Sequence, residues 1–193
     1  FPKKKTLHFK LIEKLRYGEN PHQESALYSQ NKVGQIKKIH GKKLSYNNYN
    51  DIFSALTISR SLPANKGVVI VKHTNPCGVS ILNNNIKSYE NALACDPLSA
   101  FGGIISCNFK IKKNLALKLN KIFIEVVIAN GFDKDALKIL SQKKNIRIID
   151  ASNFSFNEIL NQNFTYNSML VQSADSFVFS KKNFKVVSKK KTK

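Results

Sequence analysis

Short apolar runs alternate with amphipathic stretches along most of this 193-residue chain. The apolar runs are rich in Val and Ile, as is typical of strands that a sheet buries on both faces, and they lie at residues 67–72, 103–107, 125–129 and 146–150. Helical spacing of apolar side chains predicts helices over residues 49–62, 86–95, 114–122 and 133–142. This alternation predicts an α/β fold in which helices cover a largely parallel or mixed sheet.

The pattern is weaker toward both ends of the chain. Residues 26–29 and 33–40 are predicted to form two strands around a Gln-Asn-Lys turn. Asn50 or Asp51 is available as the N-cap of the helix that follows. Beyond residue 150 the sequence is polar and rich in Asn, with short strand candidates at 169–172 and 184–188 before a lysine-rich end. We expect the main core to lie between about residues 24 and 150.

Composition sets the broad class of the protein. A hydrophobic content of 42% suffices for a packed core, in one large domain or two small ones. No apolar run approaches the roughly 18 to 20 residues that a membrane-spanning helix needs, so we expect a soluble protein. The three cysteines form no Cys-x-x-Cys pair, which favours a reducing, cytoplasmic location. Because the chain opens with Phe1 and its one methionine is Met169, we expect it to be a piece of a longer protein.

The formal net charge of +20 raises the possibility of nucleic-acid binding. Of the 32 basic residues, however, three are arginine, the residue that base recognition and bidentate phosphate binding favour. Lys, Asn, Ile and Phe, all abundant here, share AT-rich codons, so genomic base composition explains the bias as well as function does. A solvated lysine surface is therefore the simpler interpretation.

Residues 15–23, LRYGENPHQ, combine a cation, aromatic rings and a Gly/Asn-Pro turn. Such a loop suits a flat anionic ligand, because Arg16 binds phosphate, Tyr17 stacks and Gly18 lets the backbone approach closely. An ordinary surface turn is the alternative.

Residues 71–78, VKHTNPCG, lie where a buried strand ends, and residues 73–78 are predicted to form the loop that follows it. Open α/β sheets bind ligands just beyond the carboxyl ends of their strands, which places Lys72 and His73 where catalytic groups are expected. A nearby ammonium keeps an imidazole neutral and able to accept a proton, and it also stabilises a developing oxyanion. The alternative is an exposed polar turn without a catalytic role.

Two weaker signals follow. Pro76-Cys77 is similar to half of a zinc-deaminase motif, but Ser80 occupies the position that needs Cys, so we expect no catalytic zinc. Residues 95–103, CDPLSAFGG, form a Pro-containing turn that leads through two glycines into a strand. Paired glycines at a strand start often only relieve crowding.

Together these segments resemble the transformylase region of the bifunctional 5-aminoimidazole-4-carboxamide ribonucleotide (AICAR) formyltransferase and IMP cyclohydrolase family. The resemblance is carried, in the same order, by residues 15–23, 71–78, 96–103, 124–129 (IEVVIA) and 145–147 (NIR). It implies a layered sandwich similar to cytidine deaminase, with a mixed sheet flanked by helices and no zinc. It also implies transfer of a formyl group from 10-formyltetrahydrofolate to the 5-amino group of AICAR, in purine biosynthesis.

The resemblance also implies roles for individual residues. His73 matches the family's catalytic histidine, a general base for the weakly nucleophilic amine, and Lys72 matches the lysine that stabilises the transition state. The residues that match nucleotide contacts are Arg16, Tyr17, Gly102 and Glu125. Asn130 stands where the family usually has proline, a change that we expect to alter loop rigidity more than chemistry.

The resemblance covers about the first half of the transformylase region. We therefore expect residues 1–14 to be a linker from a missing cyclohydrolase domain, residues 15–193 to be the first part of the transformylase domain, and residues 151–193 to begin its connection to a missing second half. The family is active as a homodimer, so this chain alone is expected to be inactive. Two alternatives remain: a noncatalytic nucleotide-binding remnant, and a basic nucleic-acid-binding module.

Overall fold

The computed structural model describes residues 1–30, 36–154, 160–165, 167–173, 175, 185 and 187. The chain divides into two compact units, Phe1–Phe154 and Ser155–Lys193. Within the described residues, every helix is too short or too polar to cross a lipid bilayer.

The first unit is built on a six-stranded sheet with strand order β3-β8-β7-β6-β4-β5. The strands are β3 (Lys37–His40), β4 (Gly67–Lys72), β5 (Asn75–Ile81), β6 (Ile104–Cys107), β7 (Val126–Ala129) and β8 (Arg147–Asp150). Strands β6, β7 and β8 run parallel, whereas β3 is antiparallel to β8, and β4 is antiparallel to both β6 and β5. The predicted α/β fold with a mixed sheet is confirmed.

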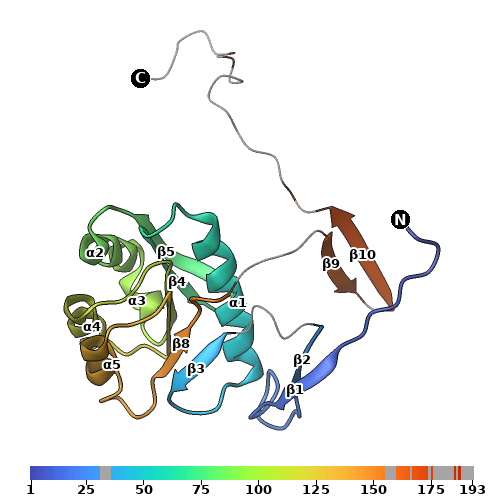
Figure 1. Cartoon of the computed structure of the whole chain (residues 1–193), viewed down its shortest axis with the longest axis horizontal. Helices are drawn as coiled ribbons and strands as arrows, with labels where there is room; N and C mark the ends of the chain where they lie inside the picture. Colours follow the sequence, from blue (N-terminus) through green and yellow to red (C-terminus); the bar gives the residue numbers. More distant parts are fainter. Residues whose placement is uncertain are drawn as a thin grey trace. The chain divides into compact units, whose positions relative to one another are not determined.

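Helices cover both faces of this sheet (Figure 1). The helix α1 (Tyr46–Ser61) lies on one face, against β4, β6 and β7. On the other face lie α2 (Asn85–Cys95), α4 (Lys113–Leu119) and α5 (Lys134–Leu140). A one-turn helix, α3 (Pro97–Ala100), replaces part of the predicted turn before β6, and Pro97 starts it with a favourable φ.

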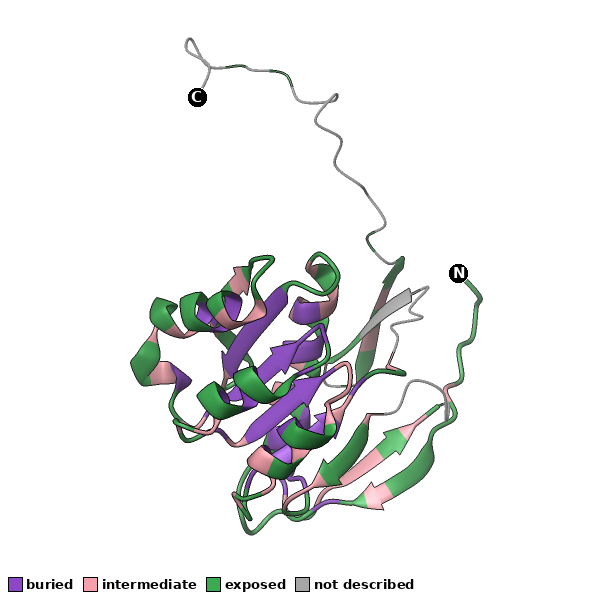
Figure 2. Ribbon diagram, turned by 60° about the vertical axis from the view of Figure 1, so that its left-hand side comes forward, coloured by how far each residue is buried: buried purple, intermediate pink, exposed green. Residues whose placement is uncertain are grey.

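The core has two parts, one on each face of the sheet, because successive side chains of a strand point to opposite faces. On β4, Val68 and Ile70 pack among the residues of α2, α4 and α5, whereas Val69 and Val71 pack beneath α1. All four are fully buried, and Figure 2 shows the central strands as continuously buried. This two-sided burial explains why the strand sequences are apolar without alternation.

Several element boundaries differ from the sequence predictions. The helix predicted over 49–62 begins at Tyr46, because Ser45 and Asn48 form a reciprocal capping box in place of a cap at Asn50 or Asp51. The predicted loop after Lys72 is wrong: Asn75 begins the strand β5, which pairs with β4.

The strand pairing near the beginning of the chain also differs from the prediction. A strand β1 (Lys10–Lys14) occupies part of the polar segment at the start of the chain and pairs with β2 (Ala26–Ser29). The predicted pairing of residues 26–29 with 33–40 is wrong, because β3 joins the main sheet beside β8. Residues 31–35 lie outside the described residues.

The second unit contains a two-stranded antiparallel ribbon, β9 (Leu160–Thr165) with β10 (Ser168–Ser173). The strand predicted at 169–172 is confirmed as part of β10, whereas β9 was not predicted in its polar, Asn-rich sequence. The candidate strand at 184–188 lies outside the described residues, apart from positions 185 and 187.

Candidate active site

One edge of the main sheet gathers four of the six candidate site residues. The register pairs Val71 of β4 with Ile104 of β6, Ile104 with Val126 of β7, and Val126 with Arg147 of β8. Lys72, the last residue of β4, therefore shares one edge with three residues just outside the strand ends: His73, Gly102 and Glu125. This edge combines the carboxyl end of β4 with the amino ends of β6, β7 and β8, because β4 is antiparallel to its neighbour β6.

The turn between β4 and β5 carries His73. Lys72 pairs with Asn75, which leaves only His73 and Thr74 in the turn, with φ angles of 51° and 63°. Both angles lie in the left-handed region, as tight two-residue hairpin turns require at their central positions. His73 is exposed, so its imidazole is accessible from solvent.

Lys72 is half-buried, and its Nζ donates a hydrogen bond to the carbonyl oxygen of Phe101 at 2.9 Å. Gly102, the next residue, has a φ of 71° and donates its N–H to the carbonyl oxygen of Phe123 at 2.9 Å. A Cβ at Gly102 would lie 3.2 Å from the ring of Phe123. The glycine is therefore required by both its backbone conformation and its surroundings.

Glu125 is held from two sides. Its Oε2 accepts a hydrogen bond from Asn48 Nδ2 of α1 at 3.0 Å, and its Oε1 lies 3.9 Å from Arg147 Nη1. The Arg147 side chain is 8% exposed, and its Nε has no hydrogen-bond partner among the described residues, whereas the Glu125 side chain is 41% exposed. Glu125 thus presents a fixed carboxylate at the surface above a buried cation.

The segment with Arg16 and Tyr17 is fastened to the start of α1 through the main chain. The N–H of Arg16 donates to the carbonyl oxygen of Leu44 at 3.3 Å, and the N–H of Tyr46 donates to that of Tyr17 at 3.2 Å. The Arg16 guanidinium lies 5.1 Å from the centre of the Tyr17 ring, a cation–π contact. Since α1 also carries Asn48, these bonds connect Arg16 and Tyr17 to the edge that holds Glu125.

Three further side chains contact residues at this edge and were not predicted to belong to the site: Asn48, Asp51 and Arg147. Asn48 contacts Glu125, and Asp51 Oδ1 accepts a hydrogen bond from the Thr74 N–H at 2.7 Å. Partial burial raises the pKa of the Asp51 carboxyl, against the smaller opposing effects of the Thr74 hydrogen bond and the nearby His73. The signal available in the sequence was the spacing of Asn48 and Asp51, which places two polar side chains on one face of a helix.

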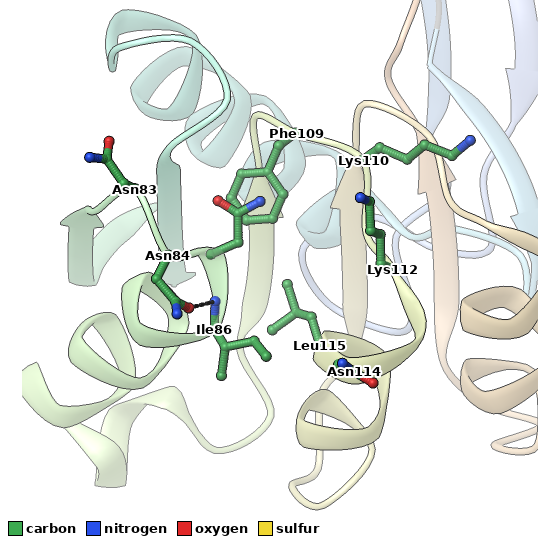
Figure 3. Close-up of a pocket in the computed structure, with 9 residues that line it drawn as sticks. Asn83, Asn84, Ile86, Phe109, Lys110, Lys112, Asn114 and Leu115 are labelled. Atoms are coloured by element: carbon green, nitrogen blue, oxygen red, sulfur yellow. Dashed lines mark hydrogen bonds between the residues drawn. The ribbon is translucent and has the colours of Figure 1, made fainter.

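A cavity of about 260 Å³ lies at the opposite edge of the sheet, and none of the six candidate residues lines it. Figure 3 shows its walls, formed by residues that follow β5 and β6: Asn83, Asn84, Asn85, Ile86, Phe109, Lys110, Lys112, Asn114 and Leu115. Asn84 is occupied as the N-cap of α2, where its Oδ1 accepts hydrogen bonds from the N–H groups of Ile86 and Lys87. The cavity is therefore separate from the edge that carries Lys72 and His73.

No group of three His, Cys, Asp or Glu side chains that could hold a metal ion occurs in the part of the chain that the structure describes. The candidate residues at and beside the edge with Lys72 supply two cations, an imidazole, a carboxylate and an aromatic ring. Such groups suit the binding of an anionic, planar ligand and proton transfer to or from it.

Comparisons with known proteins identify the family of this chain. A family model described as "AICARFT/IMPCHase bienzyme" matches residues 1–193. The chain is 42% identical over 199 residues to the bifunctional purine biosynthesis protein PurH of Acetivibrio thermocellus, covering 99% of this chain and 38% of that protein. It is 38% identical over 195 residues to PurH of Listeria welshimeri, covering 98% of this chain and 38% of that protein.

A third relative, PurH of Prochlorococcus marinus, is 45% identical over 152 residues, which cover 73% of this chain and 29% of the relative. The chain thus spans less than two fifths of the length of the curated relatives it matches. The match of the family model over every residue shows that the chain belongs to the AICARFT/IMPCHase bienzyme family.

Proposed function

We propose that this chain supplies part of the active site for formyl transfer from 10-formyltetrahydrofolate to the 5-amino group of AICAR, a step of IMP biosynthesis in the cytoplasm. The observation that carries the proposal is the convergence of the candidate residues. Lys72, His73, Gly102 and Glu125 share one sheet edge, and the main chain of Arg16 and Tyr17 is hydrogen-bonded to residues 44 and 46 at the start of the helix beside it. These residues come from four separate segments of the chain.

The proposed chemistry assigns His73 as the general base. The amine of AICAR is conjugated to its imidazole ring and is a weak nucleophile, so removing its proton as the C–N bond forms lowers the barrier. The bond between the formyl carbon and N10 of the folate then breaks, and the proton held by His73 passes to N10, so that tetrahydrofolate leaves. The exposed His73 ring is accessible for this step. Lys72 stabilises the negative charge that develops on the formyl oxygen, which a fixed ammonium close to the reacting carbonyl does well.

The remaining candidates bind the nucleotide in this proposal. Arg16 pairs with an anionic group, and Tyr17 offers a ring face beside it. The fixed Glu125 carboxylate accepts hydrogen bonds from N–H groups of the substrate. Gly102 lets the ligand approach the backbone closely.

We also propose the wider organisation that the family implies. Residues 15–193 form the first part of a transformylase domain with a cytidine deaminase-like fold, and residues 1–14 form the linker that leads into it. A full-length homodimer completes the active site, and the folate contacts come from segments outside this chain.

A chimera tests the function. This chain replaces the matching segment of the Acetivibrio thermocellus relative, and formyl transfer is measured with AICAR and 10-formyltetrahydrofolate. We expect an active chimera in which His73→Ala lowers the rate by about 100-fold or more, the scale of a general base. His8→Ala, at an exposed position near the start of the chain, serves as the control. A near-normal rate for His73→Ala removes His73 from this role.

A nucleotide-binding protein without turnover is the second candidate, since the Arg16–Tyr17 pair and the Glu125 carboxylate can bind a nucleotide without a catalytic step. Two titrations of the 193-residue chain distinguish the enzyme, the nucleotide-binding protein and the nucleic-acid-binding module. One is an isothermal titration with AICAR, and the other is a titration with nucleic acid at two salt concentrations. Binding of AICAR together with an inactive chimera supports the second candidate. Salt-dependent binding of nucleic acid alone supports a basic nucleic-acid-binding module.

A further inference from the structure

The turn that carries His73 has a backbone conformation that its own residues disfavour. His73 and Thr74 both have positive φ angles, 51° and 63°, although neither is glycine. Asn, Asp and Gly are the usual residues at such turn positions, and a β-branched side chain such as that of Thr74 is especially disfavoured there. Conformations of this kind persist when the surrounding structure holds them in place, and they gather at functional sites.

Two side chains of α1 hold this turn. Asp51 Oδ1 accepts a hydrogen bond from the Thr74 N–H at 2.7 Å, and Ser54 Oγ donates one to the Thr74 carbonyl oxygen at 2.5 Å. Both main-chain polar groups of Thr74 are therefore bonded to the same helix. Asp51 and Ser54 are three residues apart, the spacing that puts two side chains on one helix face.

The helix itself is fixed to the candidate site. Its first turn is capped by Ser45 and Asn48, and Asn48 donates to Glu125 at the start of β7. The same helix therefore sets the positions of the Glu125 carboxylate and of the turn with His73. A shift of α1 would move both groups relative to each other.

Asp51 accepts the Thr74 hydrogen bond at an energetic cost. Its carboxyl is partly buried, and burial raises its pKa, since the ionised form loses contact with water. The charge on Glu125 raises this pKa further, whereas the turn, through the Thr74 N–H, His73 and the His73 N–H, lowers it. A neutral hydrogen-bond acceptor would fix Thr74 without this cost.

We propose that Asp51 and Ser54 act as positioning residues: together they hold the His73–Thr74 turn in its left-handed conformation and so fix where the His73 imidazole lies at the candidate site. The pair acts through the turn and does not touch the substrate. This inference rests on the proposed function for its catalytic consequence, although the effect on the turn is independent of it.

The first experiment measures the turn in the 193-residue chain by NMR. The three-bond HN–Hα couplings and the intraresidue NOEs of His73 and Thr74 report whether φ is positive. We expect the left-handed signature in the wild type and in Asp51→Asn, whose amide oxygen still accepts the Thr74 N–H. We expect its loss in Asp51→Ala and its weakening in Ser54→Ala. Asp135→Asn, at an exposed position on α5, is the matched control.

A retained left-handed signature in Asp51→Ala, with the amide shifts of β6, β7 and β8 unchanged, overturns the proposal. If Asp51→Ala does not fold, Ser54→Ala decides, since it removes one bond from a half-exposed side chain. An unchanged turn in a folded Ser54→Ala variant then counts against the proposal in the same way.

The second experiment measures kinetics in the chimera described above. Misplacing a catalytic group by about 1 Å can cost up to 100-fold in rate, so we expect Asp51→Ala to lower kcat by about 10-fold, with the KM for AICAR changed less than twofold. Asp51→Asn should restore most of the rate. A change in KM alone, or no rescue by Asn, contradicts a positioning role. If the parent chimera is inactive, the proposed function fails, whereas the NMR result still decides whether Asp51 and Ser54 hold the turn.

Discussion

The Lys72 Nζ donates a hydrogen bond to the carbonyl oxygen of Phe101, so the end of β4 is tied to the loop that precedes β6. The side chain is half-buried, and this bond restricts the freedom of a normally flexible lysine. The ammonium is thereby placed near Gly102, which follows Phe101 and has a left-handed backbone conformation. A fixed ammonium at this point is better suited to stabilising a developing negative charge than to attracting anions in general.

Replacing Lys72 should therefore affect turnover more than binding. In the chimera we expect Lys72→Met to lower kcat by about 100-fold, the usual cost of removing one oxyanion donor, with KM changed little. Lys66→Met, at an exposed position just before the opposite end of the same strand, is the control. A rise in KM with normal kcat would instead assign Lys72 to ground-state binding.

Gly102→Ala should destabilise the fold. An L-residue in a left-handed conformation costs roughly 1–2 kcal/mol, and the new Cβ must also displace the Phe123 ring. Gly131→Ala separates the two effects, since its φ is 93° but its Cβ would approach nothing closer than Lys110 Cγ at 3.9 Å. Urea unfolding should show a larger decrease in the free energy of unfolding for Gly102→Ala than for Gly131→Ala. Equal decreases would mean that the Phe123 ring moves aside without an energetic penalty.

The stability of Asp51→Asn should depend on pH relative to the wild type. Burial raises the pKa of Asp51 above its ordinary value of 3.8, so the folded chain binds the proton more tightly than the unfolded chain does. The contribution of Asp51 to stability is therefore complete below pH 3.8 and is lost as the pH rises through the folded pKa. Asn cannot ionise and escapes this loss.

Unfolding free energies at pH 4 and pH 7 check this expectation. The difference between Asp51→Asn and wild type should become more favourable to the variant at pH 7. The exposed Asp135→Asn should show no such trend. A difference that is constant with pH would show that burial does not penalise the Asp51 charge.

The three cysteines should react with iodoacetamide in the order Cys95, Cys77, Cys107. Cys95 is exposed, whereas partial burial raises the pKa of Cys77 and complete burial raises that of Cys107. Less thiolate and less access both slow alkylation. Mass spectrometry at pH 8 should find Cys107 unmodified until urea unfolds the chain. Early modification of Cys107 would contradict its burial in β6 against the residues of α2, α4 and α5.

The sequence predicted the central strands well, because β4, β6, β7 and β8 are buried on both faces and are apolar throughout. It failed at β5, which is exposed along much of its length and begins with Asn75 and Pro76, residues typical of a loop. Proline is tolerated there because β5 is an edge strand of the sheet. Burial on one face leaves too little apolar signal for the strand to be recognised.

The candidate site was only partly predictable for a related reason. Strand ends can be located in a sequence, but strand direction cannot. The sequence therefore placed Lys72 and His73 at a strand end, but it did not indicate that the carboxyl end of β4 lies beside the amino ends of β6, β7 and β8. Asn48 and Glu125 are 77 residues apart, and nothing in either local sequence indicates that they meet. The contact of Asp51 with the turn likewise exists only after β4 has packed beneath α1.

The two bonds that join residues 16 and 17 to residues 44 and 46 run from main chain to main chain. The exposed Tyr46 side chain can change without loss of its bond, whereas Leu44 is buried in the core and proline at 16 or 46 would remove a donor. Substitutions are therefore tolerated at position 46 and restricted to apolar residues at position 44. A lineage with a strong codon bias, such as the one this lysine- and asparagine-rich chain suggests, can thus change the exposed side of this segment without breaking the main-chain bonds that hold it.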